Sequence, residues 1–342
     1  MTELKNMRVL LNKRPVGEPR DDDFRIETVP VAEPGEGELL LKVLWLSLDP
    51  YMRGRMNDVK SYAPPVGLGE VMVGETVNQV IISKSPHYTV GDIVVGGVGW
   101  QQYAVVPGDS KEIRKVDPEL GPISTALYVL GMTGRTAYFG LLQVGEPKPG
   151  ETVVVAAASG AVGSVVGQIA KIKGCRAVGI AGGKEKCDYV KNELGFDAVI
   201  DRKGGNMAAD LKAACPDGID VYFENVGGEV LHAVTPLLNP GARVPICGFV
   251  SQYNKEVPSE MEAPHNVLAK LPNPPFHRFL LVREWIREWA AATAQLSAWV
   301  KAGKLKYRES VVDGLDNAPA TFRGLLQGKN FGKQLIRVAD PD

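Results

Sequence analysis

The segment from residue 151 to residue 174 constrains the fold more than any other part of the sequence. A β-branched run, ETVVV, is followed by AAASGAVG and then by a stretch in which apolar residues recur at i, i+3, i+4, i+7 and i+8. That spacing predicts a helix with one apolar face. The residues of this face are Val162, Val165, Val166, Ile169 and Ala170. A strand, a glycine turn and an amphipathic helix in this order are typical of a dinucleotide-binding fold.

Strands and helices alternate through residues 123–299. Short β-branched runs stand at 152–158, 176–182, 197–201, 218–226, 242–250 and 277–282, with helical patterns between most of them. Alternation at this spacing predicts an α/β fold with a doubly wound parallel sheet and helices on both faces. Beyond a predicted helix at 283–303, the chain ends in a strand, a helix and a strand, at 305–314, 317–330 and 333–339.

The first 122 residues have a different character. They are rich in Gly and Pro, and β-branched runs predict strands at 38–48, 70–82 and 91–98, with no long helix. We therefore expect a β-rich domain there. A length of 342 residues agrees with about two domains.

Composition and charge exclude several classes of function. The 39 basic and 40 acidic residues give no net positive charge that would favour nucleic acid. No apolar run approaches the roughly 20 residues that span a bilayer, and the N-terminus has no signal-peptide pattern. The four cysteines are scattered without a C-x-x-C motif, as expected for reduced thiols in a cytoplasmic protein.

The glycine turn departs from the usual G-x-G-x-x-G because Ala158 occupies the first position. Gly160 and Gly163 keep the two positions at which a side chain would collide with a pyrophosphate or with the strand. The context therefore predicts a dinucleotide site. The alternative is an ordinary glycine turn of an α/β protein that binds no ligand.

The end of the second strand predicts which dinucleotide binds. NAD sites place Asp or Glu there, whereas this strand ends at Gly182 and Gly183 and is followed by lysines in GKEK. Lys186 and Arg202 are the cations that we expect to bind a 2′-phosphate, so NADPH is the predicted cofactor. The alternative is that the lysines are solvated residues at the start of a helix.

Several motifs together resemble the medium-chain dehydrogenase/reductase superfamily. They are ASGAVGSVVGQIAKIKGC, VYFENVGGE, ICGFVSQYN, GLLQGKNFGKQLIRV and LSLDPYMRGRM. The most similar branch is the zinc-free alkenal double-bond reductase and prostaglandin reductase group. The resemblance implies a Rossmann domain at 123–299 and a GroES-like domain at 1–122 that carries the substrate and catalytic residues. It also implies that residues 300–342 return to the GroES-like domain.

The resemblance also implies the cofactor contacts and the assembly. The turn would bind the pyrophosphate, Lys186 and Arg202 the 2′-phosphate, and other segments the nicotinamide side. The cofactor-binding residues would be Gly160, Ala161, Val162, Gly163, Lys186, Arg202, Asn225, Cys247, Gly248, Phe249, Val250, Ser251, Tyr253, Leu280, Leu281, Val282 and Asn330. A homodimer is expected, formed by the edges of VPICGFVSQ and RFLLV.

A catalytic zinc is not expected. Zinc sites need thiolate, imidazole or carboxylate ligands around an open position. The first 122 residues contain no cysteine, and their only histidine is His87. No tyrosine is followed four residues later by lysine, so the Tyr-x-x-x-Lys pattern of another NAD(P) family is also absent.

Tyr51 is the candidate catalytic residue. Hydride addition to an activated C=C bond places charge on the carbonyl oxygen, which a hydrogen-bond donor must stabilise. The alternative for Tyr51 is a packing role. Arg53 and Arg55 are interpreted as surface residues, Tyr138 as a core residue, and Tyr253 as a cofactor contact or second donor. His265 and His277, which flank the proline-rich loop 272–275, are interpreted as surface residues.

Three functions follow from these residues. The leading prediction is zinc-independent, NADPH-dependent reduction of the C=C bond of α,β-unsaturated aldehydes and ketones, with hydride transfer to the β-carbon. An NADPH:quinone oxidoreductase is the first alternative. A non-catalytic NADPH-binding sensor or structural protein is an alternative of another class.

Overall fold

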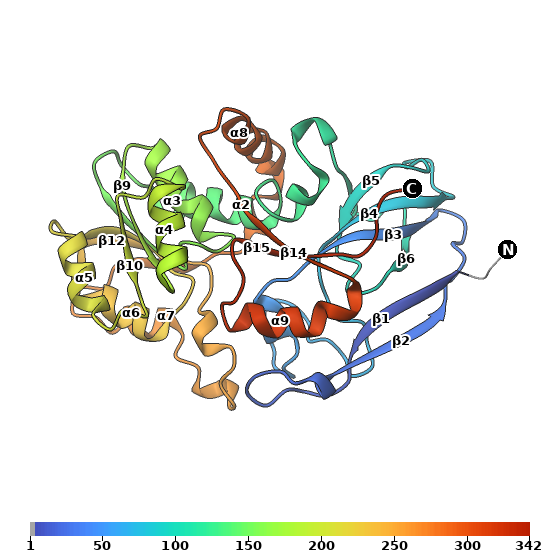
Figure 1. The fold of residues 1–342 in the computed structure, drawn as a ribbon, viewed down its shortest axis with the longest axis horizontal. Coiled ribbons are helices and arrows are strands. Elements are labelled where there is room, and N and C mark those ends of the chain that lie inside the picture. The colour runs from blue at the N-terminus through green and yellow to red at the C-terminus, as the bar shows by residue number, and fades with distance from the viewer. Residues whose placement is uncertain (1–3) are drawn as a thin grey trace.

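A six-stranded parallel sheet forms the lobe on the left of Figure 1, in a computed structural model that describes residues 4–342. Its strand order is β10 (Ala198–Asp201), β9 (Arg176–Ala181), β8 (Thr152–Ala156), β11 (Ile219–Phe223), β12 (Leu238–Ile246) and β13 (Phe276–Phe279). Each adjacent pair runs parallel. All residues of the central strand β8 are buried, as expected for a parallel sheet covered on both faces.

Helices cover both faces of this sheet, and alternate residues of β8 point into two different cores. Val153 and Val155 pack with side chains of α2 (Met132–Phe139), α3 (Gly163–Ile172), α4 (Lys184–Asn192) and α8 (Trp289–Lys301). Val154 and Ala156 pack with α5 (Met207–Ala214), α6 (Gly228–Val234) and α7 (Pro264–Leu268). The predicted apolar face of α3 lies in the first core, where Val165, Val166, Ile169 and Ala170 are fully buried.

The second lobe is β-rich. Its seven-stranded sheet follows the order β14 (Glu309–Asp313), β15 (Lys333–Arg337), β3 (Glu38–Ser47), β4 (Thr76–Ser83), β5 (Ile93–Gly96) and β7 (Arg114–Lys115), with β6 (Tyr103–Pro107) also pairing with β3. A hairpin of β1 (Lys5–Leu11) and β2 (Phe24–Pro30) adjoins it. The short helix α1 (Tyr51–Arg55) follows β3, and α9 (Ala318–Leu326) connects β14 to β15.

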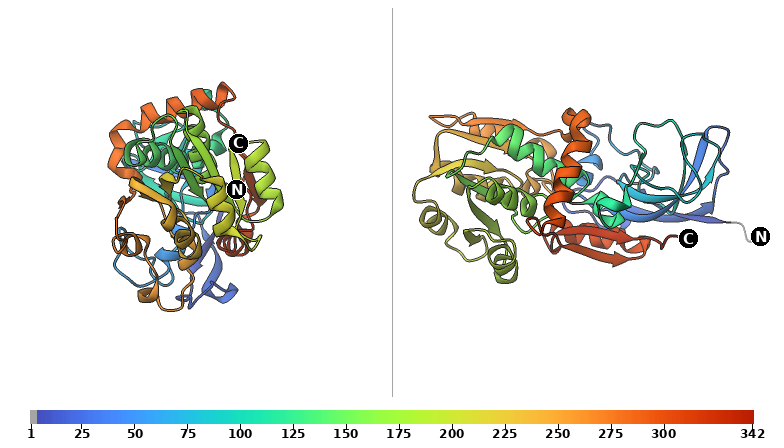
Figure 2. Two further views of the ribbon diagram at one scale, coloured as in Figure 1. Left: turned by 90° about the vertical axis from the view of Figure 1, so that its left-hand side faces the viewer. Right: turned by 90° about the horizontal axis from the view of Figure 1, so that it is seen from above.

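The chain ends in the lobe in which it began. Strand β15 pairs antiparallel with β3, with Leu335 opposite Ser47, and β14 pairs parallel with β15. Figures 1 and 2 place the C-terminus on this lobe, which also contains strand β1. A Rossmann sheet combined with a GroES-like β-rich lobe confirms the fold class that the sequence predicted.

Three local predictions from sequence were wrong. Strand β12 does not form a sheet edge, because β11 and β13 flank it; only β13 lies at that end. The strand predicted at 70–82 begins at Thr76. Arg53 is 1% exposed instead of lying on the surface, and its guanidinium donates to the Gly17 carbonyl at 2.9 Å and to Asn57 Oδ1 at 2.6 Å. Within residues 4–342, no helix combines the length and apolarity that a membrane crossing requires.

Candidate functional site

The glycine turn between β8 and α3 leaves almost no space for side chains. A Cβ on Gly163 would lie 2.3 Å from the Ala157 carbonyl oxygen, and one on Gly160 would lie 3.2 Å from the same atom. Ala157 itself has a φ of 53°, in the left-handed region. The turn therefore needs glycine at 163 for the close approach of helix and strand.

The structure explains why Ala158 replaces the first glycine of the motif. Its side chain is fully buried and lies where a Cβ on Gly179 of the neighbouring strand β9 would come within 2.8 Å. The methyl group of Ala158 therefore occupies space that Gly179 leaves free. The Ala158 N–H donates to the Ile180 carbonyl at 3.0 Å, which keeps the turn against β9.

Three cations gather at the tip of β9. Lys186 comes from α4, and Arg202 and Lys203 follow β10. The Lys186 ammonium is half-buried, and its pKa is lowered first by burial and then by the charges of Lys203 and Arg202. Arg202 lies against the strand end, since a Cβ on Gly182 would be 3.1 Å from its Nε. Like charges held together in this way form a site that an anion would stabilise.

Asp201 lies beside these cations and was not predicted from the sequence. Its Oδ1 accepts hydrogen bonds from the N–H groups of Gly183 at 2.7 Å and Lys203 at 2.9 Å, and these bonds lower its pKa. The carboxylate therefore fixes both loops that carry the cations. It comes from the end of the neighbouring strand β10, so a search of the residues that follow β9 does not find it.

The segment from Gly328 to Gly332 crosses the glycine turn. The Lys186 ammonium donates to the Gly328 carbonyl at 2.6 Å, and the Gly332 N–H donates to the Ser159 carbonyl at 3.0 Å. Gly160 and Gly332 form a parallel bridge. The Asn330 amide donates to the Gly332 carbonyl at 2.8 Å. The tail thus brings Asn330 to the turn.

The ends of β8, β11 and β12 hold the residues assigned to the nicotinamide side. The Asn225 amide donates to the Ala156 carbonyl at 2.8 Å and so joins β11 to β8. Cys247 donates its N–H to the Glu224 carbonyl at 2.9 Å, and burial raises the pKa of its thiol to about 12. These two residues therefore lie at the carboxyl ends of the strands, where α/β folds bind ligands.

Glu224 is a buried carboxyl that the sequence reading did not identify. Its side chain is 0% exposed, and burial raises its pKa to about 7, although hydrogen bonds, chiefly from the Gly227 and Val226 backbone, oppose that rise. Oε1 accepts from Val226 N–H at 2.6 Å and from Gly227 N–H at 2.9 Å. Glu224 therefore fixes the FENVGG turn that carries Asn225.

The loop after β12 brings aromatic rings to the same end of the sheet. The rings of Phe249 and Tyr253 lie 5.2 Å apart, and Phe249 lies 6.2 Å from Phe279. The Phe249 N–H donates to the Tyr253 hydroxyl at 3.3 Å, and that oxygen would lie 2.8 Å from a Cβ on Gly248. Ser251 Oγ donates to the Val226 carbonyl at 2.6 Å, next to Val250, so the loop is tied to the FENVGG turn.

The three predicted residues after β13, Leu280 to Val282, differ in how exposed their side chains are. Leu280 is 9% exposed and packs in the core, while Leu281 is 45% exposed. The Val282 carbonyl accepts a hydrogen bond from the Trp289 indole at 2.9 Å. Of the three residues predicted here, Leu281 is therefore the side chain most accessible to a ligand.

Tyr51 begins α1 in the β-rich lobe and is partly buried. Its pKa is raised well above the ordinary value by burial, then by the charges of Asp49 and Glu75. Tyr62 lies within electrostatic range of both Tyr51 and Tyr253, which comes from the other lobe. Tyr62 therefore lies near a phenol of each lobe, and Tyr51 stays protonated at neutral pH.

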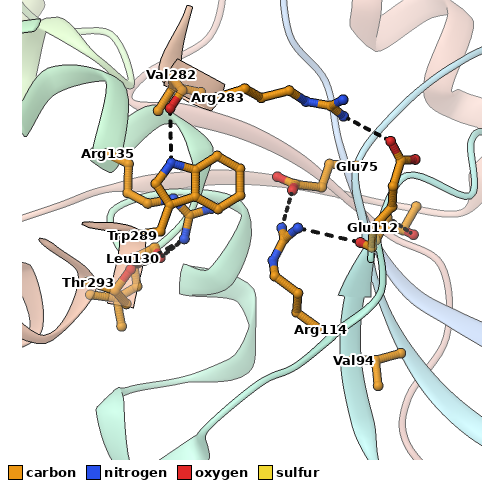
Figure 3. A network of polar contacts seen from close by, with 12 residues as sticks. Glu75, Val94, Glu112, Arg114, Leu130, Arg135, Val282, Arg283, Trp289 and Thr293 are labelled. Atoms are coloured by element: carbon orange, nitrogen blue, oxygen red, sulfur yellow. Dashed lines mark hydrogen bonds and ion pairs between the residues drawn. The ribbon is translucent and has the colours of Figure 1, made fainter. Parts of the chain in front are cut away.

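A network of charged residues joins the two lobes beside this site (Figure 3). Glu75 Oε1 accepts from the Arg114 guanidinium at 3.3 Å, and no residue in 4–342 bonds its buried Oε2. The guanidinium groups of Arg135 and Arg114 lie 4.4 Å and 5.0 Å from the Trp289 ring centroid, in cation–π geometry. Burial raises the pKa of Glu75, while Arg135 and Arg114 oppose that rise.

The other candidates from sequence take structural positions. Arg55 Nε donates to the Pro64 carbonyl at 2.6 Å. Tyr138 packs against Phe139 and Trp299. The rings of His265 and His277 lie 6.0 Å apart, and no three His, Cys, Asp or Glu side chains in residues 4–342 form a group suited to a metal ion.

Comparison with known proteins agrees with this arrangement. Residues 7–116 match a family model described as the N-terminal domain of oxidoreductase, and residues 161–270 match one described as zinc-binding dehydrogenase. The NADPH-dependent curcumin reductase of Escherichia coli (strain K12) is 50% identical over 341 residues, which cover 99% of this chain and 98% of the relative. The 2-alkenal reductase (NADP(+)-dependent) of Nicotiana tabacum is 39% identical, with 98% of each chain covered.

A solved structure extends the likeness to the whole fold. The crystal structure of CurA in complex with NADPH from Vibrio vulnificus superposes with a TM-score of 0.92 at 47% identity and covers 98% of this chain and 100% of that one. This chain belongs to the medium-chain dehydrogenase/reductase superfamily, in the branch of the alkenal and prostaglandin reductases.

Proposed function

We propose that this protein is an NADPH-dependent reductase of the C=C bond in α,β-unsaturated aldehydes and ketones. The observation that carries the proposal is the position of Tyr51, a partly buried and protonated phenol within electrostatic range of Tyr62, which lies within the same range of Tyr253 from the Rossmann lobe. The cation cluster at Lys186 and Arg202 supports NADPH over NADH. The names of the two curated relatives agree with both parts.

The residues present fit NADPH. The turn has no space for a side chain at Gly163 and little at Gly160. Without side chains there, a pyrophosphate can approach the N-terminus of α3. Lys186, Arg202 and Lys203 form a cluster of like charges that a 2′-phosphate would neutralise. Asn225, the segment 247–253, Leu281 and Asn330 are the residues we assign to the nicotinamide half.

The chemistry divides between cofactor and protein. NADPH, when bound, supplies a hydride to the β-carbon of the substrate. Tyr51 donates a hydrogen bond to the substrate carbonyl oxygen, where negative charge develops as the enolate forms. Its raised pKa keeps the proton on the phenol, so the donor is present throughout the neutral pH range. The α-carbon then takes a proton from solvent or from a nearby donor.

Two other functions stay open to test. A quinone oxidoreductase needs hydride donation to a polarised acceptor but no donor at an enolate oxygen. A non-catalytic NADPH-binding protein would use the same cofactor residues without turnover. The test is NADPH oxidation in a single turnover with cinnamaldehyde, chalcone and menadione. Reduction of the first two supports the proposal, and activity with menadione alone favours the quinone reductase. No turnover with any acceptor contradicts both enzymes.

We also propose that the protein is a cytoplasmic homodimer. Strand β13 pairs with β12 on one side, and no strand of residues 4–342 pairs with its other side. Phe276 and Phe279 of this strand are 56% and 42% exposed, so pairing of two β13 edges would bury both the free backbone and these rings. Light scattering should give twice the mass of 36.9 kDa, and a monomer at micromolar concentration would contradict the proposal.

A further inference from the structure

Lys333 and Asp49 form a buried ion pair that the proposed mechanism does not yet use. The Lys333 ammonium donates to Asp49 Oδ1 at 2.7 Å and to the Leu48 carbonyl at 2.8 Å. The side chains of Lys333 and Asp49 are 1% and 6% exposed. Burying two charges costs free energy that a well-packed apolar pair would avoid, so such a pair contributes little net stability. The geometry around the pair shows which residues it could instead hold in position.

The ion pair fixes the backbone directly before the proposed catalytic residue. Leu48 and Asp49 link the end of β3 to α1, and the Met52 N–H donates to the Asp49 carbonyl at 3.1 Å. Ser47 Oγ also donates to the Asp49 carboxylate. Tyr51 therefore begins a helix whose first turn is tied to Asp49, and Asp49 is in turn held by Lys333.

Lys333 directly follows Gly332, the residue of the tail that contacts the glycine turn. Gly332 donates its N–H to Ser159 and forms the bridge to Gly160. A Cβ on Gly332 would lie 1.9 Å from the Arg308 carbonyl oxygen, and the Lys333 N–H donates to that oxygen at 2.9 Å. Position 332 therefore accepts only glycine. A single peptide bond joins Gly332, which contacts the glycine turn, to Lys333, which holds Asp49.

We propose that Lys333 is a positioning residue that couples the occupied cofactor turn to the placement of Tyr51 for the substrate. The proposal rests on the proposed function and on the donor role of Tyr51. Contacts at Gly328, Gly332 and Lys333 link the 2′-phosphate cations, the pyrophosphate turn and α1 through one tail segment. Cofactor occupancy therefore orders the substrate-binding side before the acceptor arrives.

The first test is a double-mutant cycle in the full-length protein, with cinnamaldehyde as the acceptor. Lys333→Met should lower kcat about tenfold, on the scale of 1.4 kcal/mol per decade, and change the NADPH dissociation constant less than about threefold. Tyr51→Phe in the Lys333→Met background should lower kcat no further, because residues that act as a unit are not additive. Lys304→Met, at an exposed lysine, is the matched control and should keep the unmodified kcat.

The second test uses hydrogen–deuterium exchange of the unmodified protein and does not depend on turnover. NADP⁺ should slow exchange in the peptide that contains residues 48–53 and leave the β1–β2 hairpin unchanged. In Lys333→Met the NADP⁺-dependent slowing at 48–53 should be lost. If exchange there does not respond to NADP⁺, the coupling is refuted even if Lys333→Met does not fold.

The outcomes separate this inference from the proposed function. Additive effects of the two substitutions, an unchanged kcat in Lys333→Met, or an unchanged kcat in Tyr51→Phe would each overturn the positioning role. An unmodified protein that turns over no acceptor would instead contradict the proposed function, while the exchange measurement would still decide whether cofactor binding reaches α1.

Discussion

At the level of single residues, the cofactor preference depends on side chains that reach one point from different elements. Lys186 belongs to α4 and Arg202 follows β10, yet both lie at the tip of β9. Lys184, two residues before Lys186, is 86% exposed at its side chain and pairs with Asp188 within the same helix. The helix thus presents one lysine to the site and one to solvent.

We expect NADPH to bind at least about tenfold tighter than NADH, a difference of about 1.4 kcal/mol. Lys186→Ala and Arg202→Ala should reduce that preference and leave NADH affinity nearly unchanged, because only the 2′-phosphate contact is removed. Lys184→Ala is the control and should bind both cofactors as the unmodified protein does. Fluorescence titration of both cofactors against the unmodified protein and the three variants measures the affinities, and equal affinities for NADH and NADPH in the unmodified protein would refute the assignment.

Tyr51→Phe should lower kcat for cinnamaldehyde reduction and leave NADPH affinity unchanged. Loss of one oxyanion donor typically costs about 10²–10³-fold in rate, but we expect about tenfold here, because other donors and water share the work. Steady-state kinetics with a parallel NADPH titration measures the effect. A variant that reduces the enal at the unmodified rate would show that Tyr51 only packs, and the donor would then be sought at Tyr253.

The position of a residue could be predicted from sequence where it follows a recognisable strand. It could not be predicted where the residue interacts with a partner that is distant in the sequence. Lys186 and Arg202 follow strand ends, and the doubly wound fold brings strand ends together. Lys333 and Asp49 are 284 residues apart, and no local pattern joins them. Asp201 acts on the turn after β9 from β10, so its role depends on strand order. Arg53 was misjudged because a charged residue is rarely buried unless it is paired.

At the level of elements, helix α3 and its glycines show how closely the sheet is covered. Gly167 lies mid-helix, where a Cβ would come within 1.8 Å of the Phe196 ring atom Cζ. Gly324 also lies within a helix, α9, but the nearest atoms to its Cβ would be 3.8 Å away on Lys329. Apolar spacing at i, i+3, i+4, i+7 and i+8 predicted α3, and the sequence also predicted a helix at 317–330, whereas only packing distinguishes the two glycines.

This pair gives opposite predictions for the same substitution. Gly167→Ala should destabilise the protein by about 1–3 kcal/mol, since overpacking outweighs the gain in helix propensity. Gly324→Ala should stabilise it by about 0.5–1 kcal/mol, because alanine is the better helix former and its methyl group has space. Thermal unfolding measures both midpoints. A rise in the midpoint for Gly167→Ala would show that the Phe196 ring moves aside easily.

The sequence correctly predicted the strands of the parallel sheet, which is covered on both faces. All six strands of the parallel sheet were found because each is a short apolar run between turns, while their order along the sheet is set by tertiary pairing. The order places β12 inside and β13 at the end. The β1–β2 hairpin was missed because its solvent-facing residues interrupt the apolar run: β2 has a single buried position, Phe24. The boundaries of the two domains at 122 and 299 stay a prediction.

At the level of the whole molecule, the two lobes are joined by the return of the chain and by the network in Figure 3. Glu75 belongs to the β-rich lobe, whereas Arg135 lies on α2 and Trp289 begins α8. Figure 2 shows α8 between the two lobes when the molecule is seen from above. The substrate site that we propose where the lobes meet therefore depends on contacts that come from both.

The network in Figure 3 contains two acids, Glu75 and Glu112, which differ in how exposed their side chains are. Glu75 has a side chain that is 16% exposed and faces two arginines, of which Arg135 is only 7% exposed. Glu112 pairs with Arg283 at 3.3 Å, and both of these side chains are more than 60% exposed. An exposed pair of this kind contributes about 0–1 kcal/mol, whereas a buried cation left without its acid costs more.

At Glu75 this cost is outweighed, because burial raises the pKa of its carboxyl despite the two arginines and the folded protein favours the neutral form. We therefore expect Glu75→Gln to stabilise the protein at neutral pH by up to about 1 kcal/mol. Glu112→Gln, the matched control, should change stability by less than about 0.5 kcal/mol. Urea unfolding followed by tryptophan fluorescence measures both, since Trp289 lies within the network and reports on it. The gain should disappear at low pH, because the Glu75 carboxyl of the unmodified protein is then protonated in both the folded and the unfolded state. Destabilisation by Glu75→Gln at neutral pH would mean that the two arginines stabilise the Glu75 carboxylate more than burial disfavours it.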